Sequence, residues 1–238
     1  MNYDQHGVIA VIPARRGSKR LPGKNLMRVG GRSLLERAIE SGLRAETVDR
    51  VIVSTDDPAV RDACKGLDVV VLGRSEFLST DTACTVDVVR DVFRKLGIPG
   101  VVILLQPTSP FREACDIDEA VRLLQRHPDT PSVATAYALG HPVEWSFEVT
   151  DGEMTPTFGW DKFGRRSQDL PGRYVLNGSV YAARGDHVAA GGELVTRGTR
   201  ILDMSPLRSI DIDTQDDLLL ATAIESLGEG GATREGER

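Results

Sequence analysis

Short runs of uninterrupted apolar residues are the feature that most constrains the fold of this chain. They read "VIAVIPA" at 8–14, "VIV" at 51–53, "VVVL" at 69–72 and "VVILL" at 101–105. A strand that is apolar along its whole length buries both of its faces, as in a parallel sheet that helices cover on both sides. The runs therefore predict buried strands rather than strands with one face in water.

Amphipathic segments with the period of a helix lie between and after these runs. They cover 32–43, 58–64, 82–97 and 116–127. The alternation of strands and helices predicts an α/β fold, with an open and mostly parallel sheet and right-handed crossovers. Ligands bind at the carboxyl ends of the strands in such sheets. The polar stretches "PARRGSK", "STDD", "QPTSP" and "LNGS" are therefore expected to form one pocket if they share an edge.

The pattern changes between about 132 and 174, where irregular strand-like residues and most of the aromatic side chains replace the helical period. We interpret about 138–174 as an antiparallel arm inserted into a single domain that spans 1–227. Its apolar face is expected to pack either against a second subunit or, as a lid, on its own sheet. Beyond the arm the sequence predicts strands at 174–183 and 199–204, a helix at 214–227 that Thr214 caps, and a disordered tail at 228–238.

Composition limits the classes of function. The 238 residues carry a formal net charge of −6, which argues against a general nucleic-acid binder. No run approaches the roughly 18 apolar residues of a membrane-spanning helix, and "MNYDQHG" lacks the features of a signal peptide. The three cysteines have no metal-binding spacing, which indicates free thiols in a reducing compartment. We therefore expect a cytoplasmic protein without nucleic-acid or membrane partners.

A basic, glycine-containing loop, "IPARRGSKRLPGKN" at 12–25, follows the first predicted strand. It differs from a Walker-type phosphate loop because five residues, not four, separate Gly17 from Gly23. Backbone N–H groups in such a turn bind anions, and the side chains of Arg15 and Lys24 add positive charge. We interpret it as a longer loop that covers a triphosphate. The alternative is a solvated run of charges, which the interleaved glycines and proline disfavour.

A pair of carboxylates separated by one residue, Asp211 and Asp213, is the second candidate for chemistry. Residues two apart on a strand face the same side, so both carboxylates can reach one site. Hard oxygen ligands of this kind suit Mg²⁺. In the alternative interpretation, Asp213 only caps the following helix and Asp211 is solvated. Asp216 and Asp217 fall in the first turn of that helix, where the helix dipole favours them.

Seven short stretches together resemble the acylneuraminate cytidylyltransferases, the family that activates sialic acids and related nine-carbon keto sugars. In the family's order they are "IPARRGSKRLPGKN", "VSTDD", "LSTDTA", "LLQPTSPFR", "RRSQDLP", "NGSVY" and "DIDTQDD". The resemblance implies a mostly parallel Rossmann-like sheet of the nucleotide-sugar transferase (GT-A-like) kind, with an antiparallel dimerisation arm and a homodimeric assembly. It also implies transfer of CMP from CTP to the anomeric hydroxyl of a nonulosonic sugar acid, with Mg²⁺ as cofactor and pyrophosphate as product.

The resemblance also implies roles for individual residues. Four would hold the triphosphate: Arg15, Gly17, Ser18 and Lys24. Around the cytidine would lie Asn25, Arg74, Asp81, Thr82 and Thr85. The sugar acid would contact Gln106, Asn177 and Tyr181, and its carboxylate would meet Arg166. Magnesium would be held by Asp211 and Asp213, and the catalytic residues would be Lys24, Arg15 and Asp211.

Some features depart from this pattern and keep alternatives open. Members that act on sialic acid often carry an arginine two residues before the asparagine of "NG", where this chain has Val175. Arg165 and Arg173 are alternatives to Arg166 as partner of the carboxylate. The alternative functions are a nucleotidyltransferase that uses GTP or another acidic substrate, and a nucleotide-binding domain without turnover.

Overall fold

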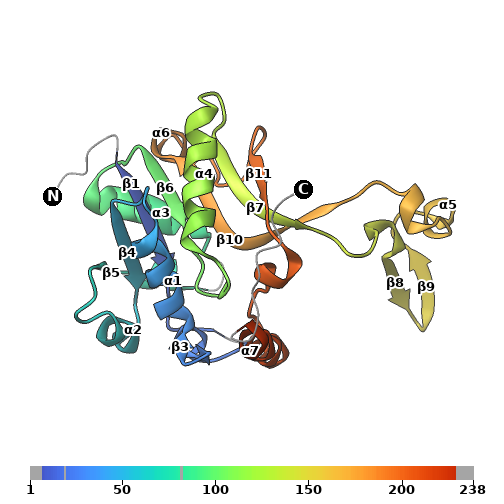
Figure 1. Cartoon of the computed structure of the whole chain (residues 1–238), viewed down its shortest axis with the longest axis horizontal. Helices are drawn as coiled ribbons and strands as arrows, with labels where there is room; N and C mark the ends of the chain where they lie inside the picture. The colour runs from blue at the N-terminus through green and yellow to red at the C-terminus, as the bar shows by residue number, and fades with distance from the viewer. Residues whose placement is uncertain (1–6, 19, 81–82, 229–238) are drawn as a thin grey trace.

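A seven-stranded sheet forms the centre of the computed structural model, which describes residues 7–18, 20–80 and 83–228 (Figure 1). Its strands are β1 (Val8–Pro13), β4 (Arg50–Thr55), β5 (Val70–Gly73), β6 (Val101–Leu104), β7 (Ser132–Ala138), β10 (Tyr174–Arg184) and β11 (Arg200–Asp203). They lie in the order β11-β7-β10-β6-β1-β4-β5. Neighbours are parallel except at β10, which is antiparallel to both β6 and β7. The predicted α/β fold with a mostly parallel sheet is confirmed.

Helices and short turns connect the strands. The helices are α1 (Leu34–Arg44), α2 (Pro58–Ala63), α3 (Thr85–Leu96), α4 (Ala114–Arg126), α5 (Trp160–Phe163), α6 (Gly185–Ala189) and α7 (Gln215–Gly228). Turns of 3-10 helix are η1 (Lys24–Leu26), η2 (Glu76–Ser79), η3 (Val143–Trp145), η4 (Ser167–Asp169) and η5 (Pro206–Ser209). Among the described residues no helix is both long and apolar enough to cross a membrane. The tail predicted at 228–238 lies outside the described residues from 229 onward.

The central strands bury both faces, as their apolar runs predict. In β1, Ala10 and Ile12 belong to one face, while Ile9 and Val11 belong to the other. All four side chains are at most 1% exposed. Helices α1 and α4 pack on the first face, and α3 and α6 pack on the second (Figure 1). Alternate residues of a strand point to opposite faces, so an apolar run satisfies both helical layers.

Helix α1 begins at a capping box. The backbone N–H of Glu36 donates to Oγ of Ser33, and the backbone N–H of Ser33 donates to Oε2 of Glu36. This arrangement satisfies N–H groups that the first turn of a helix leaves unpaired. Between β1 and α1 the chain forms η1 and the ribbon of β2 (Arg28–Val29) with β3 (Arg32–Ser33). The basic loop therefore does not run directly into a helix, in agreement with the sequence.

Helix α7 follows Thr214, whose hydroxyl oxygen accepts from the backbone N–H of Asp217 at 3.3 Å. Oδ2 of Asp217 in turn accepts from the backbone N–H groups of Asp213 and Thr214, at 3.0 and 2.7 Å. The predicted cap at Thr214 is present. The helix dipole alone does not account for an acidic residue at position 217. The carboxylate of Asp217 also accepts hydrogen bonds from the two backbone N–H groups that precede the helix.

The segment between β7 and β10 forms an arm that extends away from the sheet (Figure 1). Its strands β8 (Phe147–Thr150) and β9 (Glu153–Pro156) pair as an antiparallel hairpin, and α5 and η4 follow. Phe147 is 49% exposed, and Val149 and Trp160 are each 64% exposed. In the described structure the arm does not fold over its own sheet as a lid.

Candidate functional site

A pocket of about 450 Å³ lies at the carboxyl ends of β1, β5 and β6; we call it the first pocket. Its wall includes the basic loop, the start of α3 and the segment before α7. Predicted site residues that line it are Arg15, Gly17, Ser18, Lys24, Asn25, Arg74, Thr85, Gln106, Asp211 and Asp213. Asp81 and Thr82 lie outside the described residues. The sheet topology therefore gathers residues from four distant parts of the chain.

The stretch "STDD" supports the basic loop and does not line the pocket, which corrects the expectation that four polar stretches form one pocket. The hydroxyl of Thr55 donates to the backbone carbonyl of Ala14 at 2.6 Å. The carboxylate of Asp56 accepts from the backbone N–H of Arg16 at 2.9 Å. Both contacts hold the loop from the neighbouring strand β4.

The loop is also held by its own residues. The side-chain amide of Asn25, which also lines the pocket, donates to the backbone carbonyl of Arg15 at 3.0 Å. Gly23 has a φ of +71°, a left-handed conformation that glycine adopts without steric cost. The turn that sets Lys24 at the start of η1 therefore requires a glycine at this position.

Two cations converge on one carboxylate at the rim of the first pocket. Nζ of Lys24 and Nη1 of Arg20 each lie 2.8 Å from a carboxylate oxygen of Asp213. This pairing shows that Asp213 faces the basic loop rather than only capping α7. Arg20 is a site residue to which the family resemblance gave no role, although its position in the basic loop was a usable signal.

Arg74 reaches the first pocket from the end of β5. Its Nε donates to the hydroxyl of Ser54 at 3.4 Å, whereas its buried Nη2 has no partner among the described residues. Burial lowers the pKa of Arg74 to about 10, so the guanidinium still carries its charge at neutral pH. Arg74 therefore supplies a positive charge and a buried donor to this pocket.

Asp211 and Asp213 lie in a segment without helix or strand, although the argument that both carboxylates face one site assumed the geometry of a strand. Between them, the fully buried Ile212 donates its backbone N–H to the carbonyl of Thr108 at 2.9 Å. Both carboxylates line the first pocket, so the predicted same-side arrangement holds without a ladder. Burial raises the pKa of Asp211, and the nearby charge of Asp213 raises it further.

The two carboxylates fit a magnesium ion that also binds substrate. Among the described residues no group of three or more metal-ligating side chains is present. Mg²⁺ is commonly held by one or two carboxylates together with substrate phosphates and water. Asp211 and Asp213 provide such a pair, so the donor set agrees with the predicted cofactor.

A second pocket, of about 400 Å³, adjoins the first; Gln106 and Asp211 line both. Its other lining residues are Tyr137, Leu176, Asn177, Gly178, Tyr181, Ser209, Ile210, Asp217 and Leu220. Burial, followed by the charge of Asp211, raises the pKa of Tyr181. No lysine or arginine occurs among the described residues that line this pocket. Tyr137 and Ser209 lie in none of the motifs, so no local pattern marks them as pocket residues.

Asn177 lines the second pocket but is occupied by internal contacts. Its Nδ2 donates to the hydroxyl of Ser209 at 2.9 Å. Its Oδ1 accepts from the hydroxyl of Thr135 at 2.6 Å and from the backbone N–H of Ser179 at 3.1 Å. Asn177 therefore holds β10, β7 and η5 together beneath the pocket.

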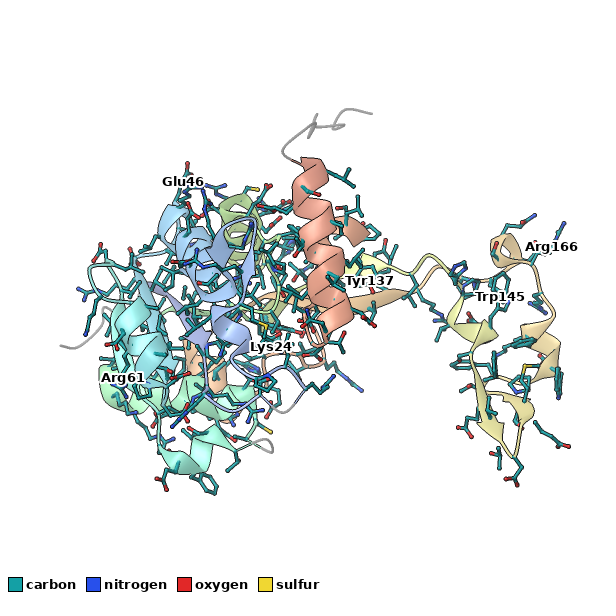
Figure 2. All side chains as sticks on the ribbon, turned by 90° about the horizontal axis from the view of Figure 1, so that it is seen from below. Lys24, Glu46, Arg61, Tyr137, Trp145 and Arg166 are labelled. Carbon is teal, nitrogen blue, oxygen red and sulfur yellow. The ribbon has the colours of Figure 1, made fainter. Side chains whose placement is uncertain are left out.

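Arg166 lies on the arm, far from Lys24 in the same chain (Figure 2). It pairs with Asp169 at 2.8 Å, and its side chain is 72% exposed. Arg173, the alternative nearer the sheet, pairs with the buried Glu144 at 3.0 Å. Neither arginine lines a described pocket wall, and neither does Val175.

A pocket at the carboxyl ends of the strands of a mostly parallel sheet is the architecture of ligand-binding α/β proteins, and the cations that line this pocket suit an anionic ligand. Within this class, the chain belongs to the cytidylyltransferase family, whose profile matches residues 9–151. The match includes the basic loop and the "QPTSPFR" stretch. The resemblance stated from the sequence is therefore confirmed.

Similar proteins agree with this assignment. The chain is 33% identical over 231 residues to the CMP-N,N'-diacetyllegionaminic acid synthase of Legionella pneumophila, covering 93% of this chain and 97% of that protein. It is 30% identical over 213 residues to an N-acylneuraminate cytidylyltransferase of Streptococcus agalactiae, covering 89% of this chain. The chain spans 51% of that relative, about half its length.

The fold is similar to that of a solved structure of CMP:2-keto-3-deoxy-manno-octonic acid synthetase complexed with CTP. The TM-score is 0.70 at 20% identity, and the match covers 93% of this chain and 99% of the other. At this identity the similarity establishes the fold alone.

Proposed function

We propose that the chain transfers CMP from CTP to the anomeric hydroxyl of a nonulosonic, sialic-acid-like sugar acid and releases pyrophosphate in the cytoplasm. The observation that carries this proposal is the pair of adjoining pockets that share Gln106 and Asp211. The first pocket is rich in cations, as a triphosphate requires, and the second presents polar side chains suited to sugar hydroxyls. Two relatives are named for N-acylneuraminate and N,N'-diacetyllegionaminic acid, which supports this class of acceptor.

The basic loop would hold the triphosphate. Arg15 can donate two parallel hydrogen bonds to phosphate oxygens, and Lys24 brings a compact positive charge. Gly17 and Ser18 would let the phosphates approach the loop backbone. Arg74 would face the cytidine, with its buried Nη2 as a donor.

The chemical step is a displacement at phosphorus. The anomeric oxygen bonds to the α-phosphorus, the bond from this phosphorus to the oxygen bridging the β-phosphate breaks, and pyrophosphate leaves. The hydroxyl proton passes to water. Such a step depends on placement of the reactants and neutralisation of charge. Gln106 and Asp211 lie at the junction of the two pockets, where the two substrates would meet. We assign no protein nucleophile.

Asp211 and Asp213 would hold Mg²⁺, which neutralises phosphate charge when it is bound. Lys24 and Arg20 contact Asp213 from the loop that would carry the phosphates. The chain's own cations and carboxylates therefore meet at one side of the first pocket, where the leaving group would lie.

The carboxylate of the sugar acid needs a cation that the lining of the second pocket does not contain among the described residues. We propose that Arg166 of the partner subunit supplies it in a homodimer. Two observations support this proposal. The arm extends away from its own sheet, and the exposed Phe147, Val149 and Trp160 give it an apolar surface that a second copy would cover.

The test of the reaction is pyrophosphate release in the presence of Mg²⁺. CTP, GTP, UTP and ATP are each combined with a panel of nonulosonic and other keto-sugar acids. Release with CTP and a nonulosonic acid is expected. Release only with GTP, or only with another acidic substrate, would replace the proposed substrates. CTP binding with no release across the panel would indicate a nucleotide-binding domain without turnover.

The homodimer is tested with two impaired variants, Arg166→Ala and Asp211→Asn, which are unfolded and refolded together and assayed at a sugar-acid concentration below the KM of Arg166→Ala. If the arm serves the partner's site, a mixed dimer has one intact site, and its activity exceeds that of either variant alone. If Arg166 serves its own chain, both sites of the mixed dimer stay defective and activity stays at the level of the single variants.

A further inference from the structure

The loop after β6 and the first half of β10 face each other at the second pocket without strand pairing. The β6–β10 ladder ends at the pair of Leu104 and Tyr181. Beyond this pair β10 is irregular, and its pairing with β7 changes register between Leu176 and Tyr181. Contacts other than a ladder must therefore set the spacing between Gln106 and the irregular segment 177–180, which we call the bulge.

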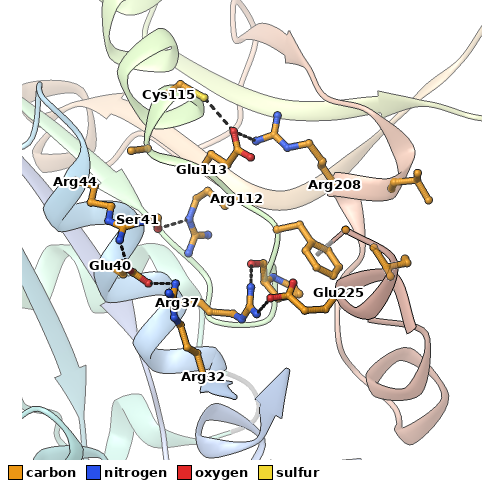
Figure 3. A pocket seen from close by; sticks show the side chains of 16 residues that line it. Arg32, Arg37, Glu40, Ser41, Arg44, Arg112, Glu113, Cys115, Arg208 and Glu225 are labelled. Carbon is orange, nitrogen blue, oxygen red and sulfur yellow. Dashed lines mark hydrogen bonds and ion pairs between the residues drawn. The ribbon is translucent and has the colours of Figure 1, made fainter. Parts of the chain in front are cut away.

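Arg112 bridges these two segments. Its Nη1 donates to the backbone carbonyl of Gln106 at 3.1 Å and to that of Ser179 at 2.7 Å. Its Nε donates to the hydroxyl of Ser41 in α1 at 3.1 Å (Figure 3). One planar guanidinium thus links the loop, the bulge and the helical layer behind the sheet.

Because Arg112 is buried, its hydrogen bonds must stabilise a charge that water does not solvate. The residue is only 6% exposed and forms no ion pair among the described residues, although the charge of Asp116 is close enough to favour its protonated form. Burial lowers its pKa to about 10, so it remains protonated at neutral pH. A buried charge without an ion-pair partner is costly, and its hydrogen bonds must offset that cost. Between the loop and the bulge the structure also has a weaker contact, from the hydroxyl of Ser109 to the carbonyl of Asn177 at 3.4 Å.

The spacing that Arg112 maintains is tight where the sugar would bind. A Cβ placed on Gly178 would lie 2.6 Å from Oε1 of Gln106. The side chain of Gln106 therefore rests directly against the bulge. A small shift of the loop relative to the bulge would redirect the Gln106 amide, which lies at the junction of the two pockets.

We propose that Arg112 is a positioning residue for the sugar-acid site: by holding the carbonyls of Gln106 and Ser179 on one guanidinium, it orients the Gln106 amide. The inference rests on the proposed function, because it assigns the second pocket to the sugar acid. Arg112 lines neither of the first two pockets. It lies on the wall of a third, of about 660 Å³, between α1, α4 and α7 (Figure 3), and so acts through the residues that it holds.

The test compares Arg112→Lys with a matched control, Arg184→Lys. Lysine keeps the charge but has a single nitrogen, so it cannot place donors at both the Nη1 position, which serves the two carbonyls, and the Nε position, which serves Ser41. Arg184 lies at the opposite end of β10 and also donates three hydrogen bonds, to the backbone carbonyls of Thr130, Leu124 and His127 at 3.0, 2.9 and 3.2 Å. Both variants lose a similar set of contacts, and only Arg112 is next to the second pocket.

Both variants are expected to have a lower Tm than the wild type. Arg112→Lys should also reduce kcat/KM for the sugar acid by about 10- to 100-fold, the effect of misplacing a substrate contact. Its Kd for CTP, measured by calorimetry, should stay within about 2-fold of the wild type, because misplacement of Gln106 leaves the cationic contacts intact. Arg184→Lys should leave both quantities unchanged.

An equal kcat/KM for the sugar acid in Arg112→Lys and Arg184→Lys would overturn the inference. It would also be overturned if Arg112→Lys lost CTP affinity by as large a factor as it lost kcat/KM for the sugar acid. Ser41→Ala covers the case in which Arg112→Lys does not fold. This substitution removes one hydrogen-bond acceptor of the guanidinium, so it should reduce kcat/KM for the sugar acid by a smaller factor than Arg112→Lys does.

An inactive wild type would count against the proposed function, and amide hydrogen exchange would then still test the role of Arg112. Exchange at Ser109 and Ser179 should increase in Arg112→Lys relative to Arg184→Lys. Unchanged exchange at both amides would overturn the inference even with no substrate known.

Discussion

An alanine at Gly178 would perturb the second pocket at its tightest point. The φ of Gly178 is +73°, and a side chain in this left-handed region costs about 1–2 kcal/mol. For a chain of this size each kcal/mol lowers Tm by about 2–4 °C, so the expected decrease is about 2–8 °C. The new Cβ would also lie 2.6 Å from Oε1 of Gln106. This oxygen ends a flexible side chain, so it moves away at little further cost but loses its position.

The matched control is Gly66→Ala. Gly66 has a φ of +81°, and a Cβ there would have no heavy atom within 4 Å among the described residues. It carries the same backbone strain but displaces nothing. Both variants should show a similar decrease in Tm by differential scanning calorimetry.

Steady-state kinetics then separate the two variants. Loss of one neutral hydrogen bond is worth about 0.5–1.5 kcal/mol, so Gly178→Ala should raise the KM for the sugar acid by about 2- to 10-fold. The KM for CTP should change little, and Gly66→Ala should change neither constant. An unchanged KM for the sugar acid in Gly178→Ala would refute the assignment of Gln106 to the sugar.

Four further predictions follow from the site, the arm and the first helix. Asp211→Asn should reduce kcat by about 100-fold or more and weaken CTP binding less, and near-normal turnover would remove Asp211 from the metal site. Arg166→Ala should raise the KM for the sugar acid and leave that for CTP nearly unchanged, whereas a selective loss of CTP affinity would contradict its assignment. Trp160→Asp should convert the proposed dimer into a monomer in light scattering, and an unchanged mass would exclude this surface from the interface. The hydrogen bond from the backbone N–H of Ser33 lowers the pKa of Glu36, so charged Glu36 stabilises the fold above its unfolded pKa and this contribution is lost as the pH falls through the lower folded pKa. Glu36→Gln should therefore have a lower Tm than the wild type at neutral pH and a similar Tm in acid, and a difference independent of pH would argue against the capping role.

Much of the fold was predictable because its causes are local. A run such as 8–14 is apolar at every position, and only a strand covered on both faces buries it completely. The capping partners Ser33 and Glu36 lie three residues apart, so helix α1 could be placed from the sequence. The basic loop was also recognisable, because Arg15 and Lys24 lie beside the glycines that bend it.

The sequence was less informative about which loop residues line each pocket. It predicted one shared pocket, whereas the structure has two adjoining pockets and uses Thr55 and Asp56 of "STDD" to support the basic loop. It used the geometry of a strand to place Asp211 and Asp213 on one side, whereas this segment belongs to no strand. In both cases the decisive contacts join residues far apart in the chain, and a local pattern does not contain them.

The sequence alone determined the elements, the family and the chemistry of the basic loop, because each depends on residues that are neighbours along the chain. Only the tertiary structure decided which side chains meet. Lys24 and Asp213 are 189 residues apart, and their side chains come within 2.8 Å because the backbone N–H of Ile212 bonds to Thr108 and so holds this segment at the carboxyl end of β6, beside the basic loop. Likewise, the sequence shows Arg112 as a basic residue but not which groups it contacts. Its contacts with Gln106 and Ser179 exist because β10 runs against its neighbours and bends where its ladder with β6 stops.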